Sequence, residues 1–390
     1  MNFYNELIKK KKIYQIFVFG MYRSGTTVIA RSLAGEKNIA FASDPIRPFF
    51  NHYRTKLQKK IKFNDIEESS RPLGNYFNSD SKYIEHLIQC DFSEKVSIKE
   101  LNKIRDDVIK QGAIYSPKFI ESLKKNINFK SLNFSEELKF YLALIISSYG
   151  NKKTSIVGFK EVWSIEMALP ILNLLGNMAK IIVILRDPLD IITSSVKGSA
   201  NYSILTLVRQ WRKQVVFYKL LKKLYPNSVQ LINYEDFCET PEYTLKHVLE
   251  NLITEPIEFF SSKLKPIDDN GNLWIKNSSY LKKKSINIDK NSIGSYKKNL
   301  KSSEIEWINY LTHMCSYKKY NHYNDIPKIP ISDFPKRNIN NVTEWAKIDI
   351  HNLEQKNLKK ELQIEHNRVK KMKSYDENRD KSLNSIIDQL

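Results

Sequence analysis

With 390 residues, the chain is long enough for two domains or for one large domain with an extension. Its 41% hydrophobic and 12% aromatic residues can build a sizeable core, which excludes global disorder, and its 11 glycines and 13 prolines exclude collagen-like and low-complexity chains. The net charge of +20 favours anionic ligands in general, although the basic residues are scattered along the chain and not gathered in one arm.

Strand and helix signals alternate along the chain. Residues 13–19 form an apolar, β-branched and aromatic run that predicts a buried strand, and residues 26–34 predict the helix after it, ending at Gly35. Further strands are predicted over 155–159, 181–185 and 229–233, and further helices over 188–196 and 240–252. This alternation predicts an α/β fold, in which a parallel sheet is flanked by helices.

Three segments depart from this alternation. Residues 50–150 are polar, lysine-rich and helical in pattern, so we interpret them as a helical insertion on the acceptor side of an α/β domain covering residues 1–325. Residues 326–340 contain three prolines and predict a linker. Residues 341–390 predict a helical tail with two open interpretations, a coiled coil that mediates self-association or a solvated helix.

A glycine loop with the sequence GMYRSGTT spans residues 20–27, between the first predicted strand and the first predicted helix. Backbone N–H groups and a helix N-terminus hold phosphate at such a position. The loop is close to the GxxxxGK[ST] pattern, but Thr26 replaces the lysine that a nucleoside triphosphate with Mg²⁺ requires. The loop therefore suits a smaller anion at a nucleotide 5′ position, held without a metal. Its predicted ligands are Arg23, Ser24, Gly25, Thr26 and Thr27.

A second candidate phosphate motif follows the strand predicted over 181–185. Arg186 lies at the carboxyl end of that strand, and Ser194 lies about two turns into the next helix. An arginine fork and a serine hydroxyl at this spacing can contact one phosphate. The alternative for Arg186 is a surface ion pair with Asp190.

Together the two motifs resemble those of the sulfotransferases that use 3′-phosphoadenosine 5′-phosphosulfate (PAPS). Residues 23–27 resemble their 5′-phosphosulfate loop, although Tyr22 stands where the family usually has proline, and Arg186 and Ser194 match the positions that bind the 3′-phosphate. The resemblance covers residues 13–310 and is specific in these two motifs. It implies an enzyme that moves a sulfuryl group from PAPS to a hydroxyl of a carbohydrate or other small acceptor by metal-independent, in-line displacement.

The resemblance extends to residues outside the two motifs. Tyr234 follows the strand predicted over 229–233, and the family places such a tyrosine near the adenine. Lys160 ends the second predicted strand, where sulfotransferases commonly have a lysine, so Lys160 and Arg23 are the predicted catalytic cations. Residues 292–297 resemble a late segment that closes over the cofactor in some members.

A hydroxyl acceptor also needs a general base within hydrogen-bond reach. Cytosolic members of the family use a histidine for this, but Val162 occupies the corresponding position. Other members use a carboxylate after the first helix, and Asp44 lies there, so Asp44 is the predicted base. Glu161, next to Lys160, is the alternative.

Cysteine and histidine usage indicates neither a disulfide framework nor a metal. Cys90, Cys238 and Cys315 lie far apart without a Cys-x-x-Cys pair, as is typical of a reducing compartment. The seven histidines show no paired ligand spacing, so no metal site is predicted. The longest apolar runs are far shorter than the roughly 20 residues of a spanning helix, and we expect a cytoplasmic protein without a membrane span.

Two other functions stay open. A P-loop kinase or nucleotide hydrolase would bind ATP or GTP with Mg²⁺, but the missing lysine and the lack of a clear Mg²⁺ carboxylate after a strand argue against it. A non-enzymatic scaffold for polyanions would show salt-sensitive binding. No basic motif interleaved with aromatics supports that function, and no nucleic-acid partner is predicted.

Overall fold

The computed structural model describes residues 8, 11–60, 82–196, 202–255, 263–275, 288, 290–313 and 318–320. The chain divides into two compact units. Unit 1 comprises Met1–Asn64, Lys82–Leu185 and Phe217–Asp289, and unit 2 comprises Asp65–Ser81, Arg186–Val216 and Lys290–Leu390. The predicted linker and helical tail lie outside the described residues.

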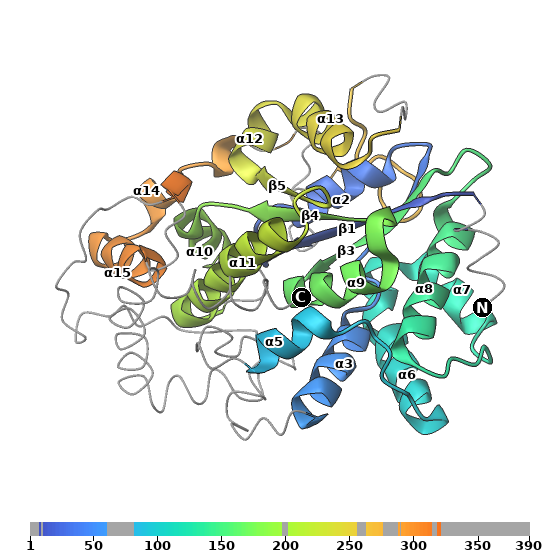
Figure 1. The fold of residues 1–390 in the computed structure, drawn as a ribbon. Coiled ribbons are helices and arrows are strands. Elements are labelled where there is room, and N and C mark those ends of the chain that lie inside the picture. Colours follow the sequence, from blue (N-terminus) through green and yellow to red (C-terminus); the bar gives the residue numbers. More distant parts are fainter. Residues whose placement is uncertain are drawn as a thin grey trace. The chain divides into compact units, whose positions relative to one another are not determined.

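Unit 1 contains a five-stranded parallel sheet with the strand order β2-β3-β1-β4-β5 (Figure 1). The strands are β1 (Tyr14–Gly20), β2 (Ile39–Ser43), β3 (Ile156–Val162), β4 (Ala179–Leu185) and β5 (Val229–Asn233). Every residue of β1, β2 and β4 is buried, as expected for a parallel sheet covered on both faces. The predicted α/β fold is therefore confirmed, and β2 is a strand that the sequence patterns did not indicate.

Helices cover the two faces of this sheet. On one face, α2 (Thr26–Ala34) and α13 (Pro241–Leu252) pack against Ile16 and Val18 of β1 through Ile29, Leu33, Leu245 and Leu249. On the other face, the rings of Phe50, on α3 (Arg47–Lys60), and Phe159, on β3, have centroids 6.0 Å apart. Because side chains alternate along a strand, neighbouring residues of β3 face opposite sides.

The helical character predicted for residues 50–150 is confirmed in the described part of that segment. Its helices after α3 are α5 (Lys82–Gln89), α6 (Ile98–Tyr115), α7 (Pro117–Lys125) and α8 (Phe134–Tyr149). Unit 1 also holds α9 (Ala168–Leu175) and α12 (Tyr234–Glu239). Arg105 of α6 and Glu137 of α8 form a buried bidentate ion pair, with N···O distances of 2.8 and 2.7 Å, which ties the insertion together.

The described helices of unit 2 include α10 (Pro188–Val196), α14 (Tyr296–Asn299) and α15 (Ser302–His313), while α11 (Ile204–Leu224) begins in unit 2 and ends in unit 1. The carboxylate of Asp187 accepts a 2.8 Å hydrogen bond from the Leu189 amide, which explains why α10 begins at Pro188 as predicted. Among the helices that the structure describes, none is long and apolar enough to cross a membrane.

Candidate active site

The carboxyl edge of the sheet carries three residues with unusual backbone geometry. Arg23, Asp44 and Trp163 have φ angles of 66°, 53° and 70°, which lie in a backbone region that residues other than glycine rarely adopt. They follow β1, β2 and β3, which are adjacent in the sheet. Such conformations cost about 1–3 kcal/mol each and cluster at functional sites. Ligands of open α/β sheets bind at this same edge, so we identify it as the candidate active site.

The glycine loop closes on itself through Ser24. The buried Ser24 hydroxyl donates to the Met21 carbonyl at 2.8 Å, and the Ser24 amide donates to the same oxygen at 3.3 Å. A Cβ atom on Gly20 would lie 2.4 Å from Thr26 Cγ2, so only glycine fits at the end of β1. Within the described part of the chain, no side chain caps the first turn of α2 and that turn contains no acidic residue. Its N–H groups therefore suit an anion.

Tyr234 lies directly against this loop. It is the first residue of α12, immediately after β5, and it is buried. A Cβ atom built on Gly25 would lie only 2.1 Å from Tyr234 Cδ2 and 2.3 Å from Cε2. The structure therefore brings Tyr234 together with the predicted phosphate loop, while its contact with an adenine stays a prediction.

Lys160 and Asp44 form a buried ion pair beside the loop. The Lys160 ammonium donates to Asp44 Oδ2, the Asp44 amide donates to the Lys160 carbonyl at 2.7 Å, and the Val162 amide donates to Asp44 Oδ1 at 3.3 Å. Lys160 is only 1% exposed and Asp44 only 7%. The structure thus joins the predicted cation and the predicted base, each of which satisfies the other's charge in the dry interior.

Aromatic stacking connects the loop to the end of β3. The Trp163 amide donates to the Gly20 carbonyl at 3.3 Å, and the Tyr22 and Trp163 rings stack with centroids 6.0 Å apart and planes 13° apart. The Arg23 guanidinium lies 5.6 Å from the centre of the Tyr22 ring. Trp163 was not predicted from the sequence. Its position directly after β3, the strand that carries Lys160, could have indicated it.

Glu161, the alternative base, faces the opposite side of the sheet from Lys160. Its Oε1 accepts a 2.6 Å hydrogen bond from the Ile46 amide, and its buried Oε2 has no partner among the described residues. Burial raises the pKa of Glu161 well above its ordinary value, and the nearby charge of Asp44 raises the pKa further. A carboxyl that holds its proton is a poor general base, so its geometry favours a role in fixing the turn before α3.

This assignment predicts how stability depends on pH. Because its pKa is raised, the folded chain keeps a proton on Glu161 that the unfolded chain releases above about pH 4.3. The protonated Glu161 carboxyl therefore contributes fully to the free energy of unfolding below about pH 4.3, the pKa of the unfolded chain. This contribution is lost as the pH rises through the higher pKa of the folded chain. Glu161→Gln keeps an acceptor for the Ile46 amide but cannot ionise. We expect the free energy of unfolding of the variant not to show this fall with rising pH, as measured by urea unfolding from about pH 5 to pH 8.

The control for that experiment is Glu121→Gln, which removes an exposed carboxylate from α7. It should keep the pH profile of the unaltered chain. A Glu161→Gln profile that coincides with the control's would show that Glu161 ionises in the folded chain as readily as in the unfolded one.

In unit 2, Arg186 and Asp190 both hold the segment around Gly294. Arg186 is 4% exposed, and its Nη2 donates to the Ser292 carbonyl at 2.8 Å. The Asp190 carboxylate accepts from the Gly294 amide at 2.7 Å and from the Tyr296 amide at 3.1 Å. Burial raises the pKa of Asp190, while the positive charge of Arg186 opposes that shift. The sequence motif thus anchors residues 292–296, a contact that sequence reasoning did not anticipate.

The two phosphate motifs fall in different units. The loop over residues 20–27 belongs to unit 1, and Arg186 and Ser194 belong to unit 2. Ser194 is half-buried on the last turn of α10. The Arg186 carbonyl accepts a 2.9 Å hydrogen bond from the indole N–H of Trp211, on α11. This bond fixes the backbone of Arg186, two residues before α10 begins. The binding roles of these residues stay predictions.

A parallel sheet whose first strand leads through a glycine loop into a helix defines an α/β protein of the P-loop-like class. Residues 15–255 match the sequence profile of a family described as "Sulfotransferase family". The chain therefore belongs to the sulfotransferase family, whose members transfer sulfuryl groups.

Solved structures of sulfotransferases align with this chain at low sequence identity. The sulfotransferase domain from the Synechococcus PCC 7002 olefin synthase has a TM-score of 0.45 and 12% identity, covering 81% of this chain and 96% of that domain. The sulfotransferase domain from the curacin biosynthetic pathway has a TM-score of 0.43 and 15% identity, covering 74% and 93%. Sulfotransferase STF9 from Mycobacterium avium has a TM-score of 0.34 and 13% identity, covering 66% and 69%. No curated protein matches the chain in sequence.

Proposed function

We propose that this protein transfers the sulfuryl group of PAPS to a hydroxyl of a carbohydrate or other small acceptor. The observation that carries the proposal is the buried Lys160–Asp44 pair, which lies at the strand end next to the loop that holds Arg23. A cation and a carboxylate at this edge are what sulfuryl transfer to a hydroxyl needs, one for the developing negative charge and one for the proton. Both charges come from side chains, so the proposed transfer is metal-independent.

The proposed reaction is a single displacement. The acceptor oxygen forms a bond to sulfur while the bond from sulfur to the 5′-phosphate oxygen breaks, and that oxygen keeps the electron pair. Arg23 and the amides at the start of α2 hold the phosphate, and Lys160 stabilises the charge that develops on the leaving oxygen. When the donor's anion replaces Asp44 as the partner of Lys160, the Asp44 carboxylate is released to accept the acceptor's proton.

Binding of the desulfated product tests the donor assignment. We expect the full chain to bind one adenosine 3′,5′-bisphosphate in a calorimetric titration without added Mg²⁺. Arg186→Ala should weaken this binding about 10–100-fold, because it removes a charged hydrogen-bond donor from the predicted 3′-phosphate site. A folded chain that does not bind the nucleotide contradicts the proposed donor.

The matched control is Arg212→Ala, which removes another buried arginine of unit 2, one that donates to the Leu311 carbonyl at 3.1 Å. It should leave the affinity for the nucleotide within about twofold of the unaltered chain, a change below about 0.5 kcal/mol. Equal losses in both variants would assign the effect to unit 2 as a whole and not to the Arg186 guanidinium.

A further inference from the structure

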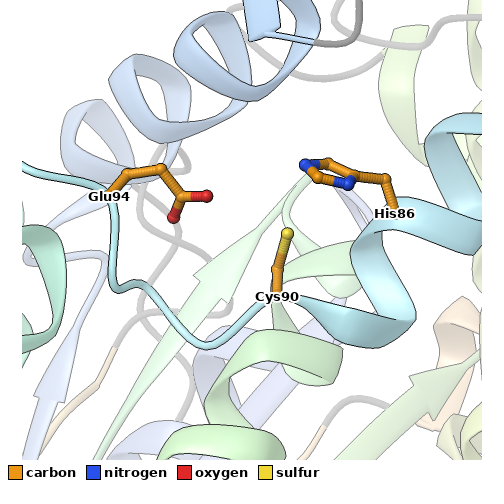
Figure 2. A group of neighbouring side chains, drawn as sticks. All are labelled: His86, Cys90 and Glu94. Atoms are coloured by element: carbon orange, nitrogen blue, oxygen red, sulfur yellow. The ribbon is translucent and has the colours of Figure 1, made fainter.

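Three side chains with metal-binding atoms converge at the end of α5, in the helical insertion. His86, Cys90 and Glu94 are spaced four residues apart, and their ligand atoms all lie within 4.8 Å of one another. Figure 2 shows the imidazole, the thiol and the carboxylate pointing toward a common space. His86 comes from the last turn of α5, Cys90 follows that helix, and Glu94 lies on the loop before α6.

Two of these groups have polar atoms that are buried without a partner. His86 Nε2 and Glu94 Oε2 are both inaccessible to solvent, and neither has a hydrogen-bond partner among the described residues. The Glu94 side chain is only 9% exposed. Buried polar atoms are normally satisfied, and orphaned ones point to an ion or water that belongs there. A cation between the three side chains would satisfy both atoms at once.

Hydrogen bonds from other elements fix the backbone that carries these side chains. Asn173 of α9 donates to the carbonyls of Ile88 and Cys90, each at 2.7 Å. The Phe92 amide donates to the Tyr53 hydroxyl at 3.3 Å, and the Phe134 amide donates to the Glu94 carbonyl at 3.2 Å. Hydrogen bonds from α3, α8 and α9 therefore hold the backbone that carries the candidate ligands.

We propose that His86, Cys90 and Glu94 bind a divalent transition-metal ion, with Zn²⁺ as the best match. Imidazole nitrogen, thiolate sulfur and carboxylate oxygen are its usual ligands, and three protein ligands leave a fourth position for water. Zinc bonds of about 2.0–2.3 Å place tetrahedral ligand atoms roughly 3.3–3.8 Å apart, so ligand atoms that lie within 4.8 Å of one another need to close by at most about 1.5 Å on binding. Cys90 binds as the thiolate and releases its proton to solvent.

Two described side chains adjoin this site, Tyr53, whose hydroxyl interacts with the Glu94 carboxylate and the Cys90 thiol, and Lys60. Lys60 Nζ lies 3.3 Å from Glu94 Oε1, but the Lys60 side chain is 58% exposed and can turn into solvent when the ion binds. The bound ion connects α5 to the loop before α6 and stabilises the insertion. This role is independent of the proposed sulfuryl transfer. The spacing His-x₃-Cys-x₃-Glu matches no common zinc motif, which explains why the sequence predicted no metal.

Titration with Co²⁺ tests the site. The full chain, stripped with a chelator and desalted, should bind one equivalent of Co²⁺ with a thiolate-to-metal charge-transfer band, and Zn²⁺ should abolish that band. Cys90→Ser should remove the band, and His86→Gln should weaken Co²⁺ binding at least tenfold. Cys238→Ser, which alters the other buried free thiol among the described residues, is the matched control and should keep the full signal.

Thermal unfolding gives a second readout that does not depend on a spectrum. Zn²⁺ should raise the Tm of the unaltered chain and of Cys238→Ser but not of His86→Gln, because an ion that binds only the folded chain stabilises it. The absence of both the band and the Tm shift in the unaltered chain overturns the proposal. A band that persists in Cys90→Ser also overturns it, since another thiolate would then be the ligand.

Discussion

Replacing Lys160 with methionine is expected to lower the free energy of unfolding by about 3–5 kcal/mol and to lower kcat for sulfuryl transfer by about 100–1000-fold. The stability loss arises because Asp44 keeps its buried carboxylate but loses the ammonium that neutralises it. The activity loss arises because no cation remains at the end of β3 to stabilise the leaving oxygen. Removing one such preorganised donor lowers kcat by about 100–1000-fold. Denaturant unfolding measures the first effect, and transfer of radiolabelled sulfuryl from PAPS to a screened acceptor measures the second.

The double variant Lys160→Met/Asp44→Asn separates these two effects. It removes both charges of the pair, so most of the lost stability should return, whereas kcat should stay at least 100-fold below that of the unaltered chain. A double variant that regains activity would exclude Lys160 and Asp44 from the chemistry. The single variant Asp44→Asn should lower kcat without weakening product binding, because the base acts on the acceptor's proton and its charge competes with the product's phosphate for Lys160.

Local patterns were enough to predict many elements of this fold. The sequence predicted α2 over 26–34, α10 over 188–196 and β5 over 229–233, and the structure has these bounds. The Asp-Pro pair before α10 acts locally. Gly35 marks the end of α2 in the sequence, but it has a helical φ of −73°, and glycine fits there because a Cβ would lie 2.1 Å from the Lys265 carbonyl oxygen. β2 (Ile39–Ser43) lacks such a signal, because its sequence IAFAS includes two alanines and one serine. Its pairing with β3, from Ile39↔Ile156 to Ser43↔Lys160, is what makes it a strand.

The candidate site shows the same division between local and non-local information. The position of Arg23, in the loop after β1, was predictable because that loop consists of consecutive residues, while its role stays a prediction. The pairing of Asp44 with Lys160 joins residues that are 116 positions apart, and the contact of Asp190 with the Gly294 amide joins residues that are 104 positions apart. No periodicity or short motif encodes such contacts. They depend on which strands become neighbours, which is decided by packing of the whole sheet.

Replacing Gly25 with alanine is expected to lower the free energy of unfolding by about 2–5 kcal/mol and to abolish binding of adenosine 3′,5′-bisphosphate. Two costs combine at this position. The φ angle of +86° is unfavourable for alanine, and the new Cβ would lie 2.1 Å from Tyr234 Cδ2, so the ring or the loop must move. Either movement displaces the amides at the start of α2 that are proposed to hold the 5′-phosphate.

Gly271→Ala is the matched control, because Gly271 has nearly the same φ, +87°, while no atom of the described chain lies within 4 Å of its added Cβ. It should lose only the backbone contribution, about 1–3 kcal/mol, and keep its affinity for the nucleotide. Adding Tyr234→Ala to Gly25→Ala removes the overlap and should return part of the stability. Denaturant unfolding and calorimetric titration measure both quantities. If Gly25→Ala proves no more harmful than Gly271→Ala, the contact between Tyr234 and the loop is not what makes glycine necessary at position 25.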